Sequence, residues 1–237
     1  MGYDVSFHPI SPDEIQEWHF TPLTWIQQGQ EEKVLALAMQ HGIEDFYAEK
    51  YLDTLRVGAE TEPDELFDKS HGFYIAVVQG FFRDYYYTRG SSFSFLMEEK
   101  PEYARYFTPW AQVVPTALPN PAKNQIIENY CSGVYLSPNQ VLQILRDLEQ
   151  EPKVLEDLEK HWSDGQFAVL KKALTAAAEL GTGLLEATEV VEPNPLHPNE
   201  STCYSNLFHC DRDGVYLYID MAMKQIAQAM EQNKSDP

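Results

Sequence analysis

The central feature of the sequence is the segment from His71 to Tyr87, which reads HGFYIAVVQGFFRDYYY. Apolar and aromatic side chains occupy nearly every position in it, so a helix formed by this stretch would present no polar face to water. A helix that is apolar all round is typical of a protein interior. We therefore predict that residues 71–87 form one helix at the centre of the core, and that its aromatic rings pack there rather than line a ligand cavity.

On the N-terminal side of this stretch, the pattern is one short strand followed by helices. Residues Tyr3 to His8 alternate apolar with polar side chains, as in a half-buried strand. Ser11-Pro12-Asp13-Glu14 combines an N-cap, a first-turn proline and a glutamate at the third helical position, so a helix is expected to start there and to end at Thr21-Pro22. The further helices expected in this half cover residues 31–40, which Gly42 terminates, residues 43–57, which Gly58 terminates, and a segment restarting at Thr61.

On the C-terminal side, prolines divide the chain before helices resume. Pro109, Pro115, Pro119 and Pro121 exclude a regular helix or a central strand from residues 106–124, which predicts a long surface loop or a boundary between subdomains. After it, we expect a short extended segment at 133–136 and three antiparallel helices between Ser137 and Gly181. Residues 184–191 could form either a helix or a strand. A helix is expected over 215–231, although its first five residues could instead form a strand.

These elements together predict a mainly α protein with one or a few short β-strands. With 237 residues, of which 43% are hydrophobic, the chain is long enough to bury a core. The expected organisation is a single globular α-helical domain over 1–237, or two packed subdomains that meet in the proline-rich stretch 109–124.

The net charge of the chain limits the classes of partner that it can bind. Seventeen Lys and Arg against 37 Asp and Glu give a net charge of -20, which repels nucleic-acid phosphates and anionic lipid headgroups. The same charge favours a basic protein partner, although it is equally compatible with a role in solubility alone. The opening lacks a secretory signal and no long apolar run occurs, so a soluble cytoplasmic protein without membrane contact is expected.

Clusters of acidic residues are the candidate contact surface for such a partner. In a chain this acidic, clusters arise from composition, so solvated helix faces are favoured over catalytic carboxylate pairs. The residues assigned to partner binding are Glu60, Glu62, Asp64, Glu65, Asp68, Asp147, Glu149, Glu156 and Asp157.

The residues that most resemble a chemical site are His197, Cys203, His209 and Cys210. Two imidazoles and two thiols can complete a tetrahedral zinc site, but this spacing matches no standard zinc motif and adjacent His209 and Cys210 rarely bind one ion. We therefore predict reduced thiols, no metal and no cofactor. No nucleotide loop, nucleophile elbow or zinc-protease motif occurs, and no catalytic residue is assigned.

Two segments carry a resemblance to known proteins. The opening MGYDVSFHPI and the segment PNPLHPNESTCYSNLFHC, residues 193–210, look like bacterial proteins of unassigned function, some of which resemble immunity partners of secreted toxins. The resemblance covers the two ends of the chain and carries over no catalytic residue. It implies a cytoplasmic protein that protects its own cell by binding tightly to a toxin domain.

Three hypotheses about function follow. The favoured one is a protein that neutralises a basic toxin or effector by covering it, with affinity from a few aromatic or aliphatic anchors. The second is an enzyme or metal-binding protein, which requires His197, Cys203, His209 and a carboxylate to converge in a cleft. The third is a small-ligand regulatory module, which requires Tyr85, Tyr86 and Phe93 to line a pocket.

Overall fold

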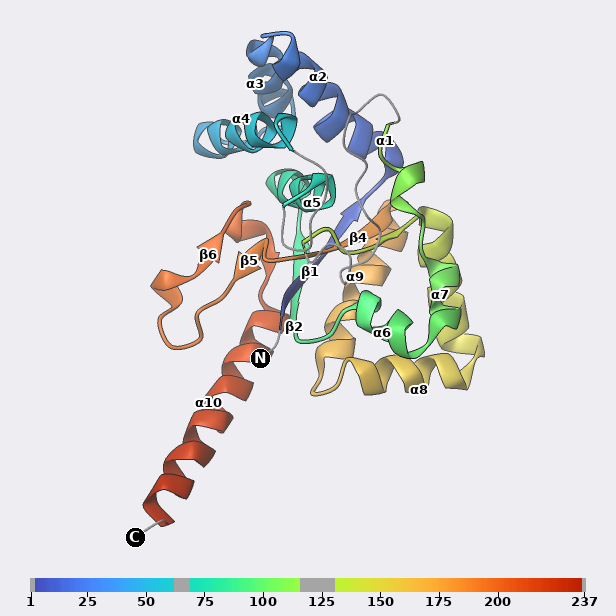
Figure 1. The fold of residues 1–237 in the computed structure, drawn as a ribbon, viewed down its shortest axis with the longest axis vertical. Coiled ribbons are helices and arrows are strands. Elements are labelled where there is room, and N and C mark those ends of the chain that lie inside the picture. The colour runs from blue at the N-terminus through green and yellow to red at the C-terminus, as the bar shows by residue number, and fades with distance from the viewer. Residues whose placement is uncertain (1–2, 62–68, 116–130, 236–237) are drawn as a thin grey trace.

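A five-stranded sheet forms the middle layer of the protein, and helices cover both of its faces (Figure 1). The computed structural model describes residues 3–61, 69–115 and 131–235. Across the sheet, the strands are β3 (Tyr135–Leu136), β4 (Gly183–Thr188), β1 (Asp4–Ile10), β2 (Tyr85–Arg89) and β7 (Cys210–Asp211). All neighbours pair antiparallel except β2 and β7, which pair parallel. The predicted class, mainly α with short strands, is confirmed.

The central strand β1 shows how the sheet separates two cores. Val5 and Phe7 point into the core that α6 to α9 cover, whereas Ile10 points into the core that α1 to α5 cover. This alternation is the period-two geometry of a strand. The predicted strand is confirmed, but it is fully buried rather than half-buried. Its polar side chains, Ser6 and His8, face Gln79 inside the protein.

The first helical layer is built from the N-terminal third of the chain. Its helices are α1 (Pro12–Ile15), the π-helical η1 (Gln16–Phe20), α2 (Thr21–Gln27), α3 (Glu31–Gln40), α4 (Asp45–Ala59) and α5 (His71–Phe82). The predicted cap at Ser11 and the predicted Gly42 terminus are present. The predicted end at Thr21-Pro22 is wrong. The π-helical turn ends at Phe20, directly before α2, and Pro22 occupies the first turn of α2, where a helix tolerates the missing N–H.

Helix α5 is the centre of this layer, and every residue from His71 to Phe81 is buried. The prediction of a buried helix here is confirmed, but its predicted extension to Tyr87 is wrong. The helix ends at Phe82, Arg83 is extended, and β2 begins at Tyr85. Aromatic and β-branched side chains favour a strand, and β1 offers this segment a pairing edge. A run that is apolar throughout does not distinguish these two outcomes.

The second helical layer follows β2. Its helices are α6 (Phe93–Glu99), η2 (Pro101–Tyr106), η3 (Trp110–Gln112), α7 (Pro138–Gln150), α8 (Pro152–His161) and α9 (Gln166–Leu180). The three helices predicted after Ser137 are present, but α8 runs across the end of α7 rather than back along it (Figure 1). Tyr106 and Trp110 are buried, so the proline-rich stretch does not begin as a surface loop. Most of the proposed subdomain boundary, residues 116–124, lies outside the described residues.

The C-terminal part adds a two-stranded sheet and a long helix. The strands β5 (Val191–Glu192) and β6 (Thr202–Cys203) pair with each other, with η4 (Pro198–Glu200) between them. The short η5 (Leu207–His209) and β7 then lead into α10 (Asp213–Ser235), which projects from the body of the protein (Figure 1). The segment at 215–219 is therefore helix. Among the described residues, no helix is long and apolar enough to cross a membrane.

Candidate functional site

The acidic residues predicted at 147–159 do not form one open surface. Asp147 accepts the Tyr106 hydroxyl at 2.5 Å and an Arg105 N–H at 3.1 Å, and its side chain is buried. Asp157 is buried too, and it accepts from the Lys100 ammonium and, at 3.1 Å, from the Tyr103 hydroxyl. Both carboxylates are thus committed to partners within the chain.

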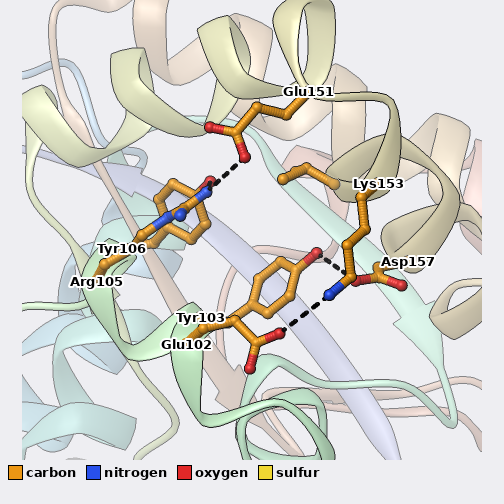
Figure 2. A pocket seen from close by; sticks show the side chains of 8 residues that line it. Glu102, Tyr103, Arg105, Tyr106, Glu151, Lys153 and Asp157 are labelled. Carbon is orange, nitrogen blue, oxygen red and sulfur yellow. Dashed lines mark hydrogen bonds and ion pairs between the residues drawn. The ribbon is translucent and has the colours of Figure 1, made fainter.

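These residues surround a small polar pocket between η2 and the start of α8 (Figure 2). Its volume is about 110 Å³, and it is lined by Glu102, Tyr103, Arg105, Tyr106, Glu151, Lys153, Val154 and Asp157. Charged side chains pair across it: Arg105 reaches Glu151 at 3.3 Å and Lys153 reaches Glu102 at 3.7 Å. The Lys100 ammonium lowers the pKa of Asp157. The arrangement fixes η2 to α7 and α8, and its charges already neutralise one another.

The other predicted contact residues are differently placed. Glu60, Glu149 and Glu156 are exposed on three separate helices or helix ends. Glu62, Asp64, Glu65 and Asp68 lie outside the described residues. Of the predicted acidic surface, the described part therefore leaves only scattered carboxylates free to meet a partner.

The predicted His and Cys residues do not converge. His197 is exposed, and His209 points its Nδ1 at the Gly80 carbonyl, 2.9 Å away. The Cys203 thiol contacts the Tyr85 hydroxyl at 3.4 Å, and burial raises the pKa of the Cys210 thiol to about 12. No group of three or more His, Cys, Asp or Glu within the described ranges is arranged to hold a metal ion. The convergence that the enzyme hypothesis requires is not found.

The aromatic residues named for a ligand pocket are core residues. Tyr85 stacks on His8 with ring centroids 4.9 Å apart, and Phe93 packs on Trp162 at 4.7 Å. Burial lowers the pKa of His8 to about 3, so this ring is neutral; its Nδ1–H donates to Gln79 at 2.7 Å. These groups belong to the interior rather than to a cleft.

One ionisable group in the interior is a carboxyl. Glu186, on β4, is fully buried and accepts N–H groups from Phe93 and Ser94 at the start of α6. Burial nevertheless raises its pKa to about 8. The side chain closes the beginning of a helix inside the protein, which is a structural task.

The segment from Cys203 to Arg212 forms the candidate contact surface of the protein. It crosses the end of α5, where the Ser205 hydroxyl donates to the Val77 carbonyl at 2.6 Å. The approach is so close that a Cβ on Gly80 would lie 2.4 Å from that hydroxyl oxygen. The Asn206 side chain then accepts the Phe208 N–H at 3.0 Å and shapes the turn of η5. The segment is held firmly by the body of the protein.

What this segment presents to solvent is apolar. Phe208 is 79% exposed and Leu207 is 50% exposed, although α5, β2 and the Asn206 side chain hold the backbone on either side of them. Tyr216, on the first turn of α10, is 56% exposed. We call the surface formed by Leu207, Phe208 and Tyr216 the Phe208 surface.

Two hollows adjoin the Phe208 surface. One, of about 380 Å³, lies between the segment and α10 and is mainly apolar; its lining is Val191, Pro193, Ser201, Leu207, Phe208, Cys210, Arg212, Val215, Tyr216 and Ile219. The other, of about 370 Å³, lies on the opposite side, where Phe208 and His209 face His41, Glu44 and Tyr47. Phe208 thus stands between two depressions that can receive side chains from another molecule.

Leu207 and Phe208 were not predicted from the sequence as site residues. The available signal is that two large apolar residues follow Ser205-Asn206 and precede His209 in a segment with no helical or strand periodicity. Comparison with known proteins adds nothing to this geometry, since no family model, curated protein or solved structure matches the chain.

Proposed function

We propose that this protein acts by binding another protein, and that the Phe208 surface is the centre of the contact. The observation that carries the proposal is the 79% exposure of Phe208 between two hollows, on a segment that is fixed to the body. Large aromatic side chains are enriched at the centres of interfaces, where they supply most of the binding energy. A backbone that is already ordered loses little entropy when it binds.

The kind of partner follows from charge. A net charge of -20 attracts a basic protein over distance and repels an acidic one. Electrostatic attraction chiefly raises the association rate, whereas the apolar anchor slows dissociation. We infer a basic toxin or effector domain as the partner, which the protein neutralises by covering it. The resemblance of residues 193–210 to immunity-type proteins supports this inference, because Leu207 and Phe208 lie in that segment.

The test uses the product of the neighbouring gene as the candidate partner. Wild-type protein is expected to retain that product in a pull-down and to protect cells that co-express it. Association should slow as salt rises from about 50 to about 500 mM, because the Debye length shortens to a few Å.

Two variants distinguish the contribution of the Phe208 surface to binding from the effect of exposed apolar side chains in general. Phe208→Ser should weaken binding by about two orders of magnitude, the loss typical of an aromatic anchor. Leu180→Ser removes a side chain of 56% exposure at the end of α9 and should leave binding unchanged. No binding by the wild type at low salt, or equal weakening by both variants, would overturn the proposal.

A further inference from the structure

A third hollow lies between α4, α5 and β6, and its lining includes neither Leu207, Phe208 nor Tyr216. Its volume is about 420 Å³, within the range of small-molecule sites. Its lining consists of Lys50, Asp53, Thr54, Val57, Lys69, Phe73, Tyr74, Val77, Cys203 and Tyr204. The proposed protein contact assigns no role to this hollow.

The wall of this hollow is apolar. Phe73, Tyr74 and Val77 lie on α5 at the bottom of the hollow, and only their edges reach its surface because all three are buried. Val57, from α4, and Tyr204, just after β6, are exposed apolar groups at its rim. A ligand that covered them would gain hydrophobic free energy in proportion to the apolar area removed from water.

Two ammonium groups stand at the same hollow. The Lys69 Nζ lies 3.7 Å from the centroid of the Tyr204 ring and 4.9 Å from that of Phe73. The Lys50 Nζ lies 3.4 Å from the Cys203 carbonyl oxygen and 5.7 Å from the centroid of the Phe46 ring. Within the described residues, neither ammonium has a carboxylate within 4.0 Å, although acidic residues outnumber basic ones by 37 to 17.

The one acidic residue of the lining does not offset these charges. Asp53 accepts an N–H from Arg56, on the same helix, at 2.7 Å, and its side chain is largely exposed. Other cations of the chain contrast with the two lysines of the hollow: Lys172, for example, contacts two carboxylates, those of Asp211 and Asp213. Burial raises the pKa of Glu192, on β5, and the Lys69 ammonium opposes that rise, so Glu192 offsets part of the Lys69 charge. The hollow therefore combines an apolar wall with two ammonium groups that make no ion pair within the described part of the chain.

We propose that this hollow binds a small organic carboxylate with an apolar body, such as a medium-chain fatty acid. The apolar body would lie against Val57 and Tyr204, above the edges of the α5 side chains, and the carboxylate would meet the ammonium groups of Lys50 and Lys69. A single negative charge suits two cations on a chain of net charge -20, whereas a polyanion would be repelled by the rest of the surface.

The test is calorimetric titration of the whole protein with decanoate and, in parallel, with decanol, its neutral counterpart. Decanoate should bind with one site per chain and more tightly than decanol. Lys69→Met and Lys50→Met should each weaken decanoate binding by about three- to tenfold, as expected for a partly exposed ion pair, and leave decanol binding unchanged. Both lysines are at the surface, so neither substitution removes a core side chain.

A matched control comes from Lys33, whose ammonium also lies over an aromatic ring, 5.9 Å from the centroid of Trp25, but at no part of this hollow. Lys33→Met should leave the affinity for decanoate unchanged. The absence of decanoate binding, equal affinity for decanoate and decanol, or equal weakening by all three lysine substitutions would each overturn the proposal. These outcomes are independent of the protein-binding test, which uses a different surface.

Discussion

Replacing the buried carboxyl of Glu186 by an amide should change how stability depends on pH. Burial raises the folded-state pKa of this group from its ordinary 4.5 to about 8. Between these values, the folded protein holds a proton that the unfolded chain has released, so the free energy of unfolding falls as pH rises from about 4.5 to about 8. Below this window both states are protonated and the penalty is absent.

The magnitude follows from the same shift. At about 1.4 kcal/mol per pKa unit, the penalty is about 1 kcal/mol near pH 5 and grows by about 4 kcal/mol by pH 9. Glu186→Gln abolishes this titration while its amide oxygen still accepts the Phe93 N–H. Because Glu186 Oε1 has no hydrogen-bond partner among the described residues, an amide NH₂ placed there costs about 1–3 kcal/mol at every pH. The variant should therefore have a lower free energy of unfolding than the wild type near pH 5. Relative to the wild type, its free energy of unfolding should rise by about 4 kcal/mol by pH 9.

Urea unfolding followed by circular dichroism, at pH steps from about 5 to about 9, measures this difference directly. The matched control is Glu179→Gln, which alters an exposed glutamate on α9 and should change the free energy of unfolding by less than about 0.5 kcal/mol. If the difference between Glu186→Gln and wild type is flat across this range, Glu186 is ionised in the folded protein and the argument from burial is refuted.

Three further predictions concern the core, the thiols and a turn. Phe81→Ala should lower the free energy of unfolding by about 3–5 kcal/mol in urea titrations, because Phe81 is buried at the centre of its core. Iodoacetamide near pH 8 should alkylate Cys203 before Cys210, as followed by mass spectrometry, because Cys210 is buried with a pKa of about 12. Gly133→Ala should lower the melting temperature sharply, because its Cβ would lie 1.9 Å from the Glu186 carbonyl oxygen.

Controls for these predictions come from the same chain. Phe46→Ala removes a phenylalanine that is 67% exposed and should change stability by less than about 0.5 kcal/mol. Gly181→Ala has a similar positive φ but meets no atom within 4 Å, so it should cost less than Gly133→Ala. Equal losses of stability in Phe81→Ala and Phe46→Ala, or in Gly133→Ala and Gly181→Ala, would contradict the reasoning. Faster alkylation of Cys210 than of Cys203 would contradict it too.

Local signals predicted much of the fold. The helix starts at Ser11 and Ser137 are predicted from a serine followed by a proline, and the structure has a capping box at each. The boundary between α5 and β2 could not be predicted from the sequence, because Tyr85 to Tyr87 fit a buried helix as well as a buried strand. Only their pairing with β1 makes them a strand. Such pairing joins residues about 80 positions apart, such as Phe7 and Tyr86, and no window along the chain contains both.

The candidate site was less predictable for a related reason. Asp147 and Asp157 look like surface carboxylates along their helices, but tyrosines and basic residues between Lys100 and Tyr106, 41 to 57 positions away, bury and neutralise them. Conversely, the sequence around Phe208 does not predict that its ring points toward solvent. That orientation is imposed by Ser205 and by the β7 pairing on either side of it.

The two edges of the central sheet bear on how a partner can attach. Both edge strands, β3 and β7, have only two residues in the described part of the chain, so each offers hardly any unpaired backbone to an incoming strand. A partner therefore cannot extend this sheet by adding a strand of its own, as many peptide ligands do. The proposed protein contact should then rely on side chains, and it should select a partner by the shape and charge of a folded surface rather than by a linear motif.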